Sequence, residues 1–264
     1  MKKDMKVALW AQNMASDRPW IKSLEQAVGD AGRAGADFFM APEYSCMAML
    51  SRAPEMPETS ELAWLAANTW MLDCDMIRLA RHSKVDVLAG TIPWRWGGRI
   101  LNQATAILTD ETGPIFWTQP KNHLTREEQD PLGWTASPGE QLRLHVSKGV
   151  RMAIAVCHDV TVDGYAARVR VLAPDIVFVP SMTETGSGRD SHEEIFGAAR
   201  KRSREWNCAV CCVGAVGVQE LPSRKETNVG GAAVYVRGEA IFDTGAMEAT
   251  EDHLGPVHVV EVAL

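Results

Sequence analysis

Long apolar stretches are missing from this sequence. No segment approaches the roughly 20 consecutive apolar residues of a membrane-spanning helix, so we expect no membrane partner. The N-terminal residues 1–6 are charged, and the apolar run that follows them is far too short for a signal peptide. These two absences favour a soluble protein located in the cytoplasm.

A surplus of basic residues is missing as well. The chain has 27 Lys and Arg residues against 34 Asp and Glu residues, which gives a formal net charge of −7. Proteins that bind nucleic acid normally carry a basic patch or stripe, so we expect no nucleic-acid partner. Linkers, low-complexity segments and repeats of a short fixed period are also absent. With 264 residues, 46% of them hydrophobic, the chain can bury a sizeable core, and we predict a single domain over residues 1–264.

Paired metal-binding motifs are a further absence. Cys208, Cys211 and Cys212 are close in sequence, but no second Cys or His pair stands at zinc-finger spacing. Residues 208–217 are apolar and indicate a buried strand, in which a free cysteine packs as a small hydrophobe. We therefore predict no metal site, and six free thiols, since disulfides are rare in cytoplasmic proteins.

Apolar runs of strand length alternate with segments of helical spacing along the chain. The strand-like runs are continuous, which favours sheets covered on both faces and an α/β fold. Residues 61–83 place apolar side chains on one side throughout and predict one long helix. Further helices are expected over residues 20–34, 163–172 and 191–206. Strands are expected over residues 7–12, 37–41, 85–92, 105–108, 115–119, 142–146, 150–156, 175–179, 208–217, 231–236, 239–242 and 257–262.

Three polar residues share one local pattern, in which an apolar strand ends and a functional group follows. Glu43 comes after the strand at 37–41, Lys121 after that at 115–119, and Cys157 after that at 150–156. Ligand sites in α/β proteins gather at strand ends, so the three side chains could converge. Taken singly, each has a simpler explanation: an exposed loop carboxylate, a solvated lysine and a core thiol.

Taken together, these segments resemble the nitrilase superfamily, the carbon–nitrogen hydrolases with a Glu-Lys-Cys triad. The resemblance rests on the order and spacing of Pro42-Glu43-Tyr44, of Lys121-Asn-His-Leu-Thr125, and of Val150 to Asp159. Further segments similar to the family cover nearly the whole chain: residues 134–139, 173–182, 198–207 and 228–235. This resemblance implies a four-layer α-β-β-α sandwich that needs no cofactor and is usually a homodimer or a larger homo-oligomer.

The family also has a second glutamate shortly after the lysine. In this sequence Glu128, the seventh residue after Lys121, fits that position best. Glu127 is adjacent and remains an alternative.

The resemblance implies a role for each of these groups in amide hydrolysis. Cys157 would attack the carbonyl carbon and form a thioester, while Glu43 carries the proton to the departing ammonia or amine. The Lys121 ammonium and the backbone N–H of His158 would hold the oxyanion. Glu128 would orient the substrate and hold Lys121.

The residues beside the cysteine depart from the family pattern. An aromatic residue commonly follows the nucleophile, whereas this chain has His158 before the retained Asp159. Relatives that act on nitriles tend to have Cys-Trp-Glu, so Cys-His-Asp favours amides. Two interpretations of His158 stay open: it contributes only its backbone N–H, or its side chain lines the pocket. His123 matches a histidine that the family often has, and we expect it to hold the lysine loop.

The substrate pocket is predicted from aromatic and polar residues at the strand ends. Tyr44, Trp94, Trp134, Met182 and Thr183 are candidates to contact a small-molecule amide. We therefore expect an amidase. Two alternatives remain: a nitrilase or N-carbamoyl amidohydrolase on the same scaffold, and a catalytically silent binding module.

Overall fold

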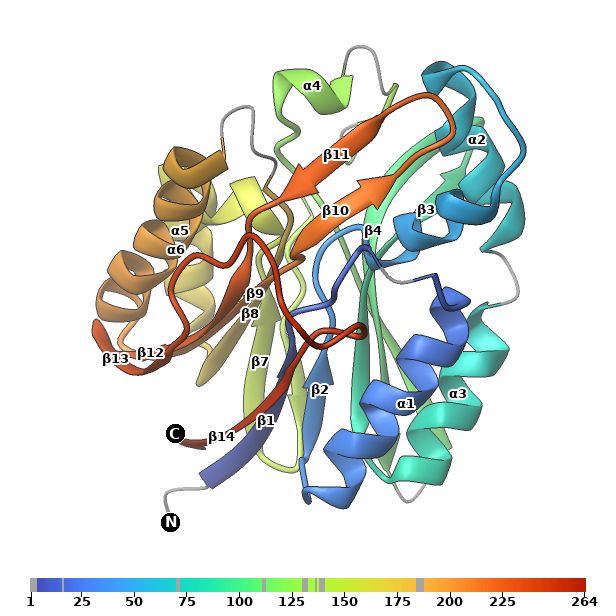
Figure 1. Ribbon diagram of the computed structural model, residues 1–264. Helices are drawn as coiled ribbons and strands as arrows, with labels where there is room; N and C mark the ends of the chain where they lie inside the picture. Colours follow the sequence, from blue (N-terminus) through green and yellow to red (C-terminus); the bar gives the residue numbers. More distant parts are fainter. Residues whose placement is uncertain are drawn as a thin grey trace.

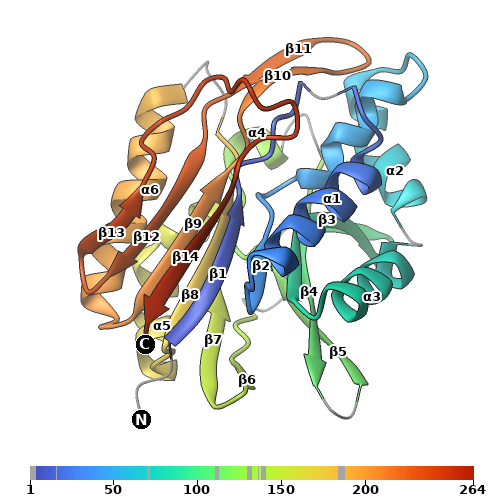
Figure 2. The same ribbon diagram turned by 60° about the horizontal axis from the view of Figure 1, so that its bottom comes forward.

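Two sheets face each other in this protein, and helices cover the outer side of each sheet (Figure 1 and Figure 2). This arrangement confirms the four-layer α-β-β-α sandwich. None of the helices in the described part of the chain combines the length and apolar character needed to span a bilayer. The computed structural model describes residues 4–15, 17–69, 72–110, 113–129, 133–135, 137, 141–183 and 188–264.

Each sheet has parallel strands at its centre and antiparallel strands at its edges. The strands of the first sheet are, in spatial order, β14 (Val257–Ala263), β1 (Asp4–Trp10), β2 (Phe38–Met40), β3 (Asp86–Trp96), β4 (Arg99–Asp110) and β5 (Gly113–Pro120). Those of the second sheet are β13 (Glu239–Asp243), β12 (Gly231–Val236), β9 (Ala209–Gly214), β8 (Ile176–Ser181), β7 (Val150–Ile154) and β6 (His145–Ser147).

The first three α-helices cover the first sheet, and the last two cover the second (Figure 2). The α-helices are α1 (Trp20–Arg33), α2 (Glu58–Asn68), α3 (Leu72–Ser83), α4 (Arg126–Gln129), α5 (Asp163–Leu172) and α6 (Gly188–Glu205). Two 3₁₀ helices follow strand ends: η1 (Ser45–Arg52) and η2 (Cys157–Val160).

The continuous apolar strands are explained by burial on both faces. In β2, Phe38 and Met40 face the second sheet, whereas Phe39 between them packs against the helices. Because successive strand residues point to opposite faces, a central strand of the inner layers has no side that faces solvent. The rings of Phe38 and Phe178 stack between the two sheets, with centroids 4.1 Å apart and planes 9° apart.

The single helix expected over residues 61–83 is wrong, because the structure has two helices there, α2 and α3. Thr69 follows α2, and both its backbone N–H and its Oγ1 donate to the Leu65 carbonyl, each at 2.9 Å. A threonine hydroxyl that bonds back to the preceding turn competes with regular helix geometry. The apolar periodicity continues past Thr69, so sequence spacing alone did not reveal this end.

The sequence pattern also missed a short hairpin, β10 (Gly217–Glu220) with β11 (Lys225–Asn228). The strand expected over residues 208–217 ends at Gly214, and Gly217 begins β10 with a φ of +87°. The hairpin leaves the second sheet and extends across the end of the sandwich toward α2 (Figure 1). Buried Gln219 fixes it there by donating to the Met47 carbonyl of η1 at 2.7 Å.

Candidate active site

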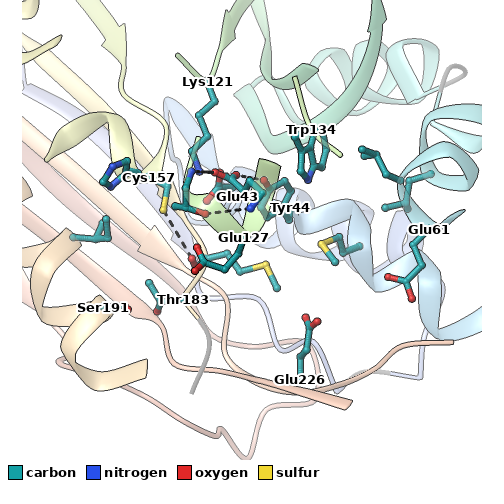
Figure 3. Close-up of a pocket in the computed structure, with 18 of the residues that line it drawn as sticks. Glu43, Tyr44, Glu61, Lys121, Glu127, Trp134, Cys157, Thr183, Ser191 and Glu226 are labelled. Atoms are coloured by element: carbon teal, nitrogen blue, oxygen red, sulfur yellow. Dashed lines mark hydrogen bonds and ion pairs between the residues drawn. The ribbon is translucent and has the colours of Figure 1, made fainter. Parts of the chain in front are cut away.

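The strand ends bring the three predicted reacting groups into one cavity. Glu43 follows β2, Lys121 follows β5 and Cys157 follows β7, so the site draws on both sheets. All three side chains are almost fully buried, with exposed fractions of 1%, 2% and 5% in that order. Figure 3 shows them on one side of the cavity.

Lys121 is held between two carboxylates. Its Nζ donates to Glu43 Oε1 at 2.8 Å and to Glu128 Oε1 at 2.7 Å. Glu128, and not the exposed Glu127, is therefore the second glutamate that contacts the lysine. Thr125, just before the short helix α4, and Glu128, within it, cap the start of this helix reciprocally: Thr125 N–H donates to Glu128 Oε2, and Glu128 N–H donates to Thr125 Oγ1. The spacing Thr-x-x-Glu is a sequence signal that would have selected Glu128.

Asn102 is a site residue that the sequence interpretation missed. It is 1% exposed on β4, and its Nδ2 donates to Glu43 Oε1 at 2.8 Å and to Glu128 Oε1 at 3.4 Å. Its carbonyl accepts the Lys121 N–H at 2.8 Å. A polar amide inside an apolar strand was the available signal. Lys121 and Asn102 both donate to Glu43 Oε1, and the Cys157 thiol is a further hydrogen-bond partner of this carboxylate.

Cys157 stands at a sharp turn between β7 and η2. Its φ of +45° lies in the left-handed region that residues with a Cβ rarely adopt. Its Sγ lies 3.9 Å from the Met182 carbonyl in the cavity wall. The turn presents the thiol at the strand end and places the backbone N–H groups of η2 immediately after it.

Asp159 fixes the loop that carries Lys121. Its fully buried carboxylate accepts the backbone N–H of Asn122 at 3.1 Å and that of His123 at 2.8 Å. His123 Nδ1 also lies 2.8 Å from Asp159 Oδ1. The side chain of this histidine therefore helps to hold the loop that carries Lys121, as expected. The segment after the cysteine thereby positions the lysine through one carboxylate.

The four predicted pocket residues Tyr44, Trp134, Met182 and Thr183 all line the cavity, which has a volume of about 390 Å³. The ring centroids of Tyr44 and Trp134 lie 5.1 Å apart, and Tyr44 Oη donates a hydrogen bond to Glu128. Trp94 is a correction: it lies in a separate surface depression, on the part of β3 that continues beyond the short strand β2 and pairs with β4 alone, and its side chain is exposed there.

His158 lines the cavity with a half-buried side chain. Its Nδ1 lies 3.1 Å from the Oγ1 of Thr161, the residue that directly follows η2. The side chain is therefore placed at the cavity wall, and its backbone N–H follows the Cys157 turn directly.

Comparison with models of known protein families identifies the family of this chain. Residues 6–241 match the model described as carbon-nitrogen hydrolase. The chain belongs to this family. A search of curated protein sequences finds no match.

Solved structures of other carbon–nitrogen hydrolases have the same fold at low sequence identity. A carbon-nitrogen hydrolase from Helicobacter pylori G27 superposes with a TM-score of 0.77 at 13% identity, covering 98% of this chain and 89% of that one. A variant of the amidase from Nesterenkonia sp. AN1 superposes with a TM-score of 0.71 at 19% identity, covering 98% and 90%. That structure shows covalent addition of the acetamide moiety of fluoroacetamide at the active-site cysteine.

A longer protein also contains this fold. The glutamine-dependent NAD+ synthetase from Acinetobacter baumannii superposes with a TM-score of 0.74 at 14% identity. The match covers 98% of this chain but only 45% of the synthetase. Our carbon–nitrogen hydrolase therefore spans less than half the length of that relative.

The two carboxylates around Lys121 in this hydrolase differ in their pKa. Burial acts to lower the pKa of Lys121, but the charges of Glu43 and Glu128 outweigh it and hold the pKa well above its usual value. Burial also acts to raise the pKa of Glu128, yet the Lys121 charge and hydrogen bonds from Lys121, Tyr44 and Thr125 lower it overall. Glu43 lacks that set of donors, and burial raises its pKa above the usual value. Two carboxyls with separated pKa values are suited to different roles.

The pKa of the Cys157 thiol is raised well above its usual value. Burial is the main cause and the Glu43 carboxylate the next, while Lys121 partly opposes both. The thiol is therefore protonated in the free protein at neutral pH. A nearby base must take its proton when it attacks.

The cysteines of β9 belong to the apolar core. In β9, Cys211 and Cys212 are fully buried, and burial raises the pKa of both thiols well above the usual value. Across the part of the chain that the structure describes, no group of His, Cys, Asp or Glu residues is arranged to hold a metal ion. All six cysteines are free, as expected.

Proposed function

We propose that this carbon–nitrogen hydrolase cleaves small non-peptide amides through a thioester on Cys157. The observation that supports this most strongly is the Lys121 ammonium, held 2.8 Å from Glu43 and 2.7 Å from Glu128 in the cavity that contains the thiol. A buried cation beside a nucleophile and a carboxylate base supplies the three groups that acyl transfer needs. The cavity of about 390 Å³ suits a small molecule.

In the first half of the reaction Cys157 Sγ attacks the carbonyl carbon while Glu43 takes the thiol proton. The oxyanion of the tetrahedral intermediate is held by Lys121 Nζ and the backbone N–H of His158. Glu43 then gives its proton to the nitrogen as the carbon–nitrogen bond breaks. Ammonia or an amine leaves, and the acyl group remains on Cys157 as a thioester.

In the second half water enters the place of the amine. Glu43 takes a proton from the water, whose oxygen attacks the thioester carbon, and the same two donors hold the second oxyanion. Collapse of this intermediate breaks the carbon–sulfur bond and releases the carboxylic acid. Glu43 returns the proton to the cysteine thiolate, which restores the starting state.

The separated pKa values of the two glutamates support this division of roles. Glu43 has the raised pKa and can hold a proton between the two steps. Glu128 has the lowered pKa and stays ionised, so it keeps Lys121 charged and in place. Because Lys121 stays protonated throughout, we assign it to charge stabilisation and not to proton transfer.

The mechanism is tested by comparing the parent with Cys157→Ala on a panel of short amides, ω-amides and N-carbamoyl compounds. We expect the parent to release acid and ammonia and the variant to be inactive. Cys74→Ala is the matched control, because Cys74 is exposed and lies outside the cavity. Equal hydrolysis by the parent and Cys157→Ala would reject the thioester.

The products also separate the alternatives on the same scaffold. A nitrilase converts a nitrile to the acid, and an N-carbamoyl amidohydrolase releases carbon dioxide together with ammonia. A silent binding module is distinguished by alkylation with iodoacetamide at neutral pH. We expect Cys157 to react far faster than the other five cysteines, because Glu43 can take its proton. Uniformly slow labelling would support the binding module.

A further inference from the structure

The side of the cavity away from Cys157 contains a second group of charges, supplied by α2 and the β10–β11 hairpin. Arg224, in the hairpin turn, contacts carboxylates from both elements. Its Nη1 lies 2.9 Å from Glu61 Oε2, its Nη2 lies 3.3 Å from Glu58 Oε1, and its Nε donates to Glu226 Oε1. In Figure 3, Glu61 and Glu226 lie across the cavity from Cys157.

These contacts decide which charge a substrate can carry at this end. Each nitrogen of the Arg224 guanidinium already contacts a carboxylate. A substrate carboxylate that approached the two remaining N–H groups of Arg224 would face the negative charges of these three glutamates. Although Arg224 lines the cavity, its surroundings therefore disfavour a substrate anion.

The two glutamates that line the cavity here each have one oxygen without a partner. Glu61 is 3% exposed, and its Oε1 is buried with no hydrogen-bond donor among the described residues. Glu226 Oε2 is in the same condition. Buried carboxylate oxygens without donors are costly, so a ligand that brings N–H donors is favoured there. Burial, with the charges of Glu226 and Glu58, raises the pKa of Glu61 despite Arg224, as expected where negative charge is in excess.

The excess is local and poorly screened. Three carboxylates, those of Glu58, Glu61 and Glu226, face the single guanidinium of Arg224. At the other end Lys121 is likewise outnumbered by Glu43 and Glu128. Further glutamates on the rim are exposed, so solvent screens their charge and they carry little weight.

Apolar side chains separate the two charged ends. Met47 and Leu50 of η1 and Leu62 and Leu65 of α2 line the cavity together with Glu61. This surface suits a short chain of methylene groups between the amide and a charged terminus.

We propose that Glu61 and Glu226 select linear amides whose end remote from the scissile carbon–nitrogen bond carries a cationic group, an ammonium or a guanidinium. This inference rests on the proposed amide hydrolysis at Cys157 and names its substrate class. The carbonyl carbon lies at Cys157, the methylene chain runs along the apolar surface, and the terminal N–H groups donate to the free carboxylate oxygens.

The test uses three primary amides of matched length that differ only at the far end. They are hexanamide, 6-aminohexanamide and the monoamide of adipic acid, with shorter members of each series. We expect the ammonium compound to have a kcat/KM about tenfold or more above hexanamide, as a charge-assisted hydrogen bond provides. The carboxylate compound should be the poorest substrate.

Variants then locate the preference. Glu61→Gln and Glu226→Gln should each reduce the ratio of kcat/KM for the ammonium amide to that for hexanamide by about tenfold. The ratio cancels any general damage to the site. Glu58→Gln is the matched control: it removes a charge from the same arginine, but Glu58 does not line the cavity, and the ratio should change less than about threefold.

The outcomes separate this inference from the proposed function. Equal use of hexanamide and 6-aminohexanamide, or a preference for the carboxylate amide, would overturn the cation site and leave the thioester mechanism standing. If the parent hydrolyses none of the three, amide hydrolysis fails, and calorimetric binding to Cys157→Ala decides the cation site. Tighter binding of 6-aminohexanamide than of hexanamide, lost in Glu61→Gln, supports it; equal binding rejects it.

Discussion

At the scale of single residues, one ammonium lies between two carboxylates with different surroundings. Glu128 accepts hydrogen bonds from Lys121, Tyr44, Thr125 and Asn102, whereas Glu43 is completely enclosed and has fewer donors. Local donors therefore decide which glutamate stays charged and which one exchanges a proton. Both predictions at this scale follow from that difference.

Replacing Glu43 by Gln should remove activity while it stabilises the fold at neutral pH. Loss of a general base lowers kcat by roughly 10²–10⁴-fold. The pKa of Glu43 is raised in the folded state, so the stability linked to it is present below the unfolded pKa and is lost as pH rises through the folded value. The Tm of Glu43→Gln relative to the parent should therefore increase as pH rises above about 4.5. Calorimetry measures both Tm values as a function of pH. If the difference in Tm between Glu43→Gln and the parent did not change with pH, the raised pKa of Glu43 would be contradicted.

Replacing Glu128 by Gln should have the opposite effect on stability. The pKa of Glu128 is lowered by Lys121, so it contributes stability above its unfolded pKa, and that contribution is lost as pH falls through the folded value. Breaking this buried ion pair costs about 3 kcal/mol at neutral pH, measurable by urea unfolding, and should lower kcat strongly. Glu127→Gln is the matched neighbour and should keep activity within about threefold, because its side chain lines the cavity from an exposed position where solvent screens its charge. Equal losses in the two variants would show that the contact with Lys121 has no special role.

At the scale of elements, the turn that carries Glu43 depends on an irregularity in β3. The pairing of β3 with β4 shifts between Leu88 and Thr91, and Gly90 has a φ of +78°. Thr91 Oγ1 then accepts the Tyr44 N–H at 2.9 Å, which holds the residue next to Glu43. A bulge in β3 thus positions the reacting group that follows the neighbouring strand β2.

Gly90→Ala should disturb both stability and activity. A Cβ at this position would lie 1.9 Å from the Pro42 carbonyl oxygen, so the turn before Glu43 must move. We expect a loss of more than about 2 kcal/mol in urea unfolding together with reduced kcat. Gly98→Ala is the control, because Gly98 has the same φ of +78° but no atom within 4 Å of the added Cβ. If both variants lost only the same small amount, backbone strain and not the Pro42 contact would be responsible.

At the scale of the whole molecule, the active site depends on the packing of two sheets. Glu43 and Lys121 extend from the first sheet and Cys157 from the second. The stacked rings of Phe38 and Phe178 lie at this interface, and Phe38 is five residues before Glu43 in the sequence. The layer between the sheets therefore sets the distance between nucleophile and base.

Phe38→Ala should destabilise the protein by about 3–5 kcal/mol, because it removes a fully buried ring from between the sheets. Urea unfolding measures the loss, and kcat should fall as the sheets adjust. Phe116→Ala is the control with the same chemical change at a side chain that is 46% exposed; its effect should stay within about 0.5 kcal/mol. Comparable losses in the two variants would mean that burial of the Phe38 ring between the sheets adds no stability.

The sequence by itself determined the fold class and the reacting groups. Continuous apolar strands require burial on both faces, which is local information, whereas Glu43, Lys121 and Cys157 were selected by the order and spacing of motifs that resemble the nitrilase superfamily. Tertiary structure decided the rest. The choice of Glu128 over Glu127, the contacts of Asn102 with Glu43 and Lys121, the end of α2 at Thr69, and the position of Trp94 depend on which segments meet in space. Arg224 and the glutamates around it are up to 166 residues apart in sequence, from Glu58 to Arg224, and only the folded hairpin brings them together.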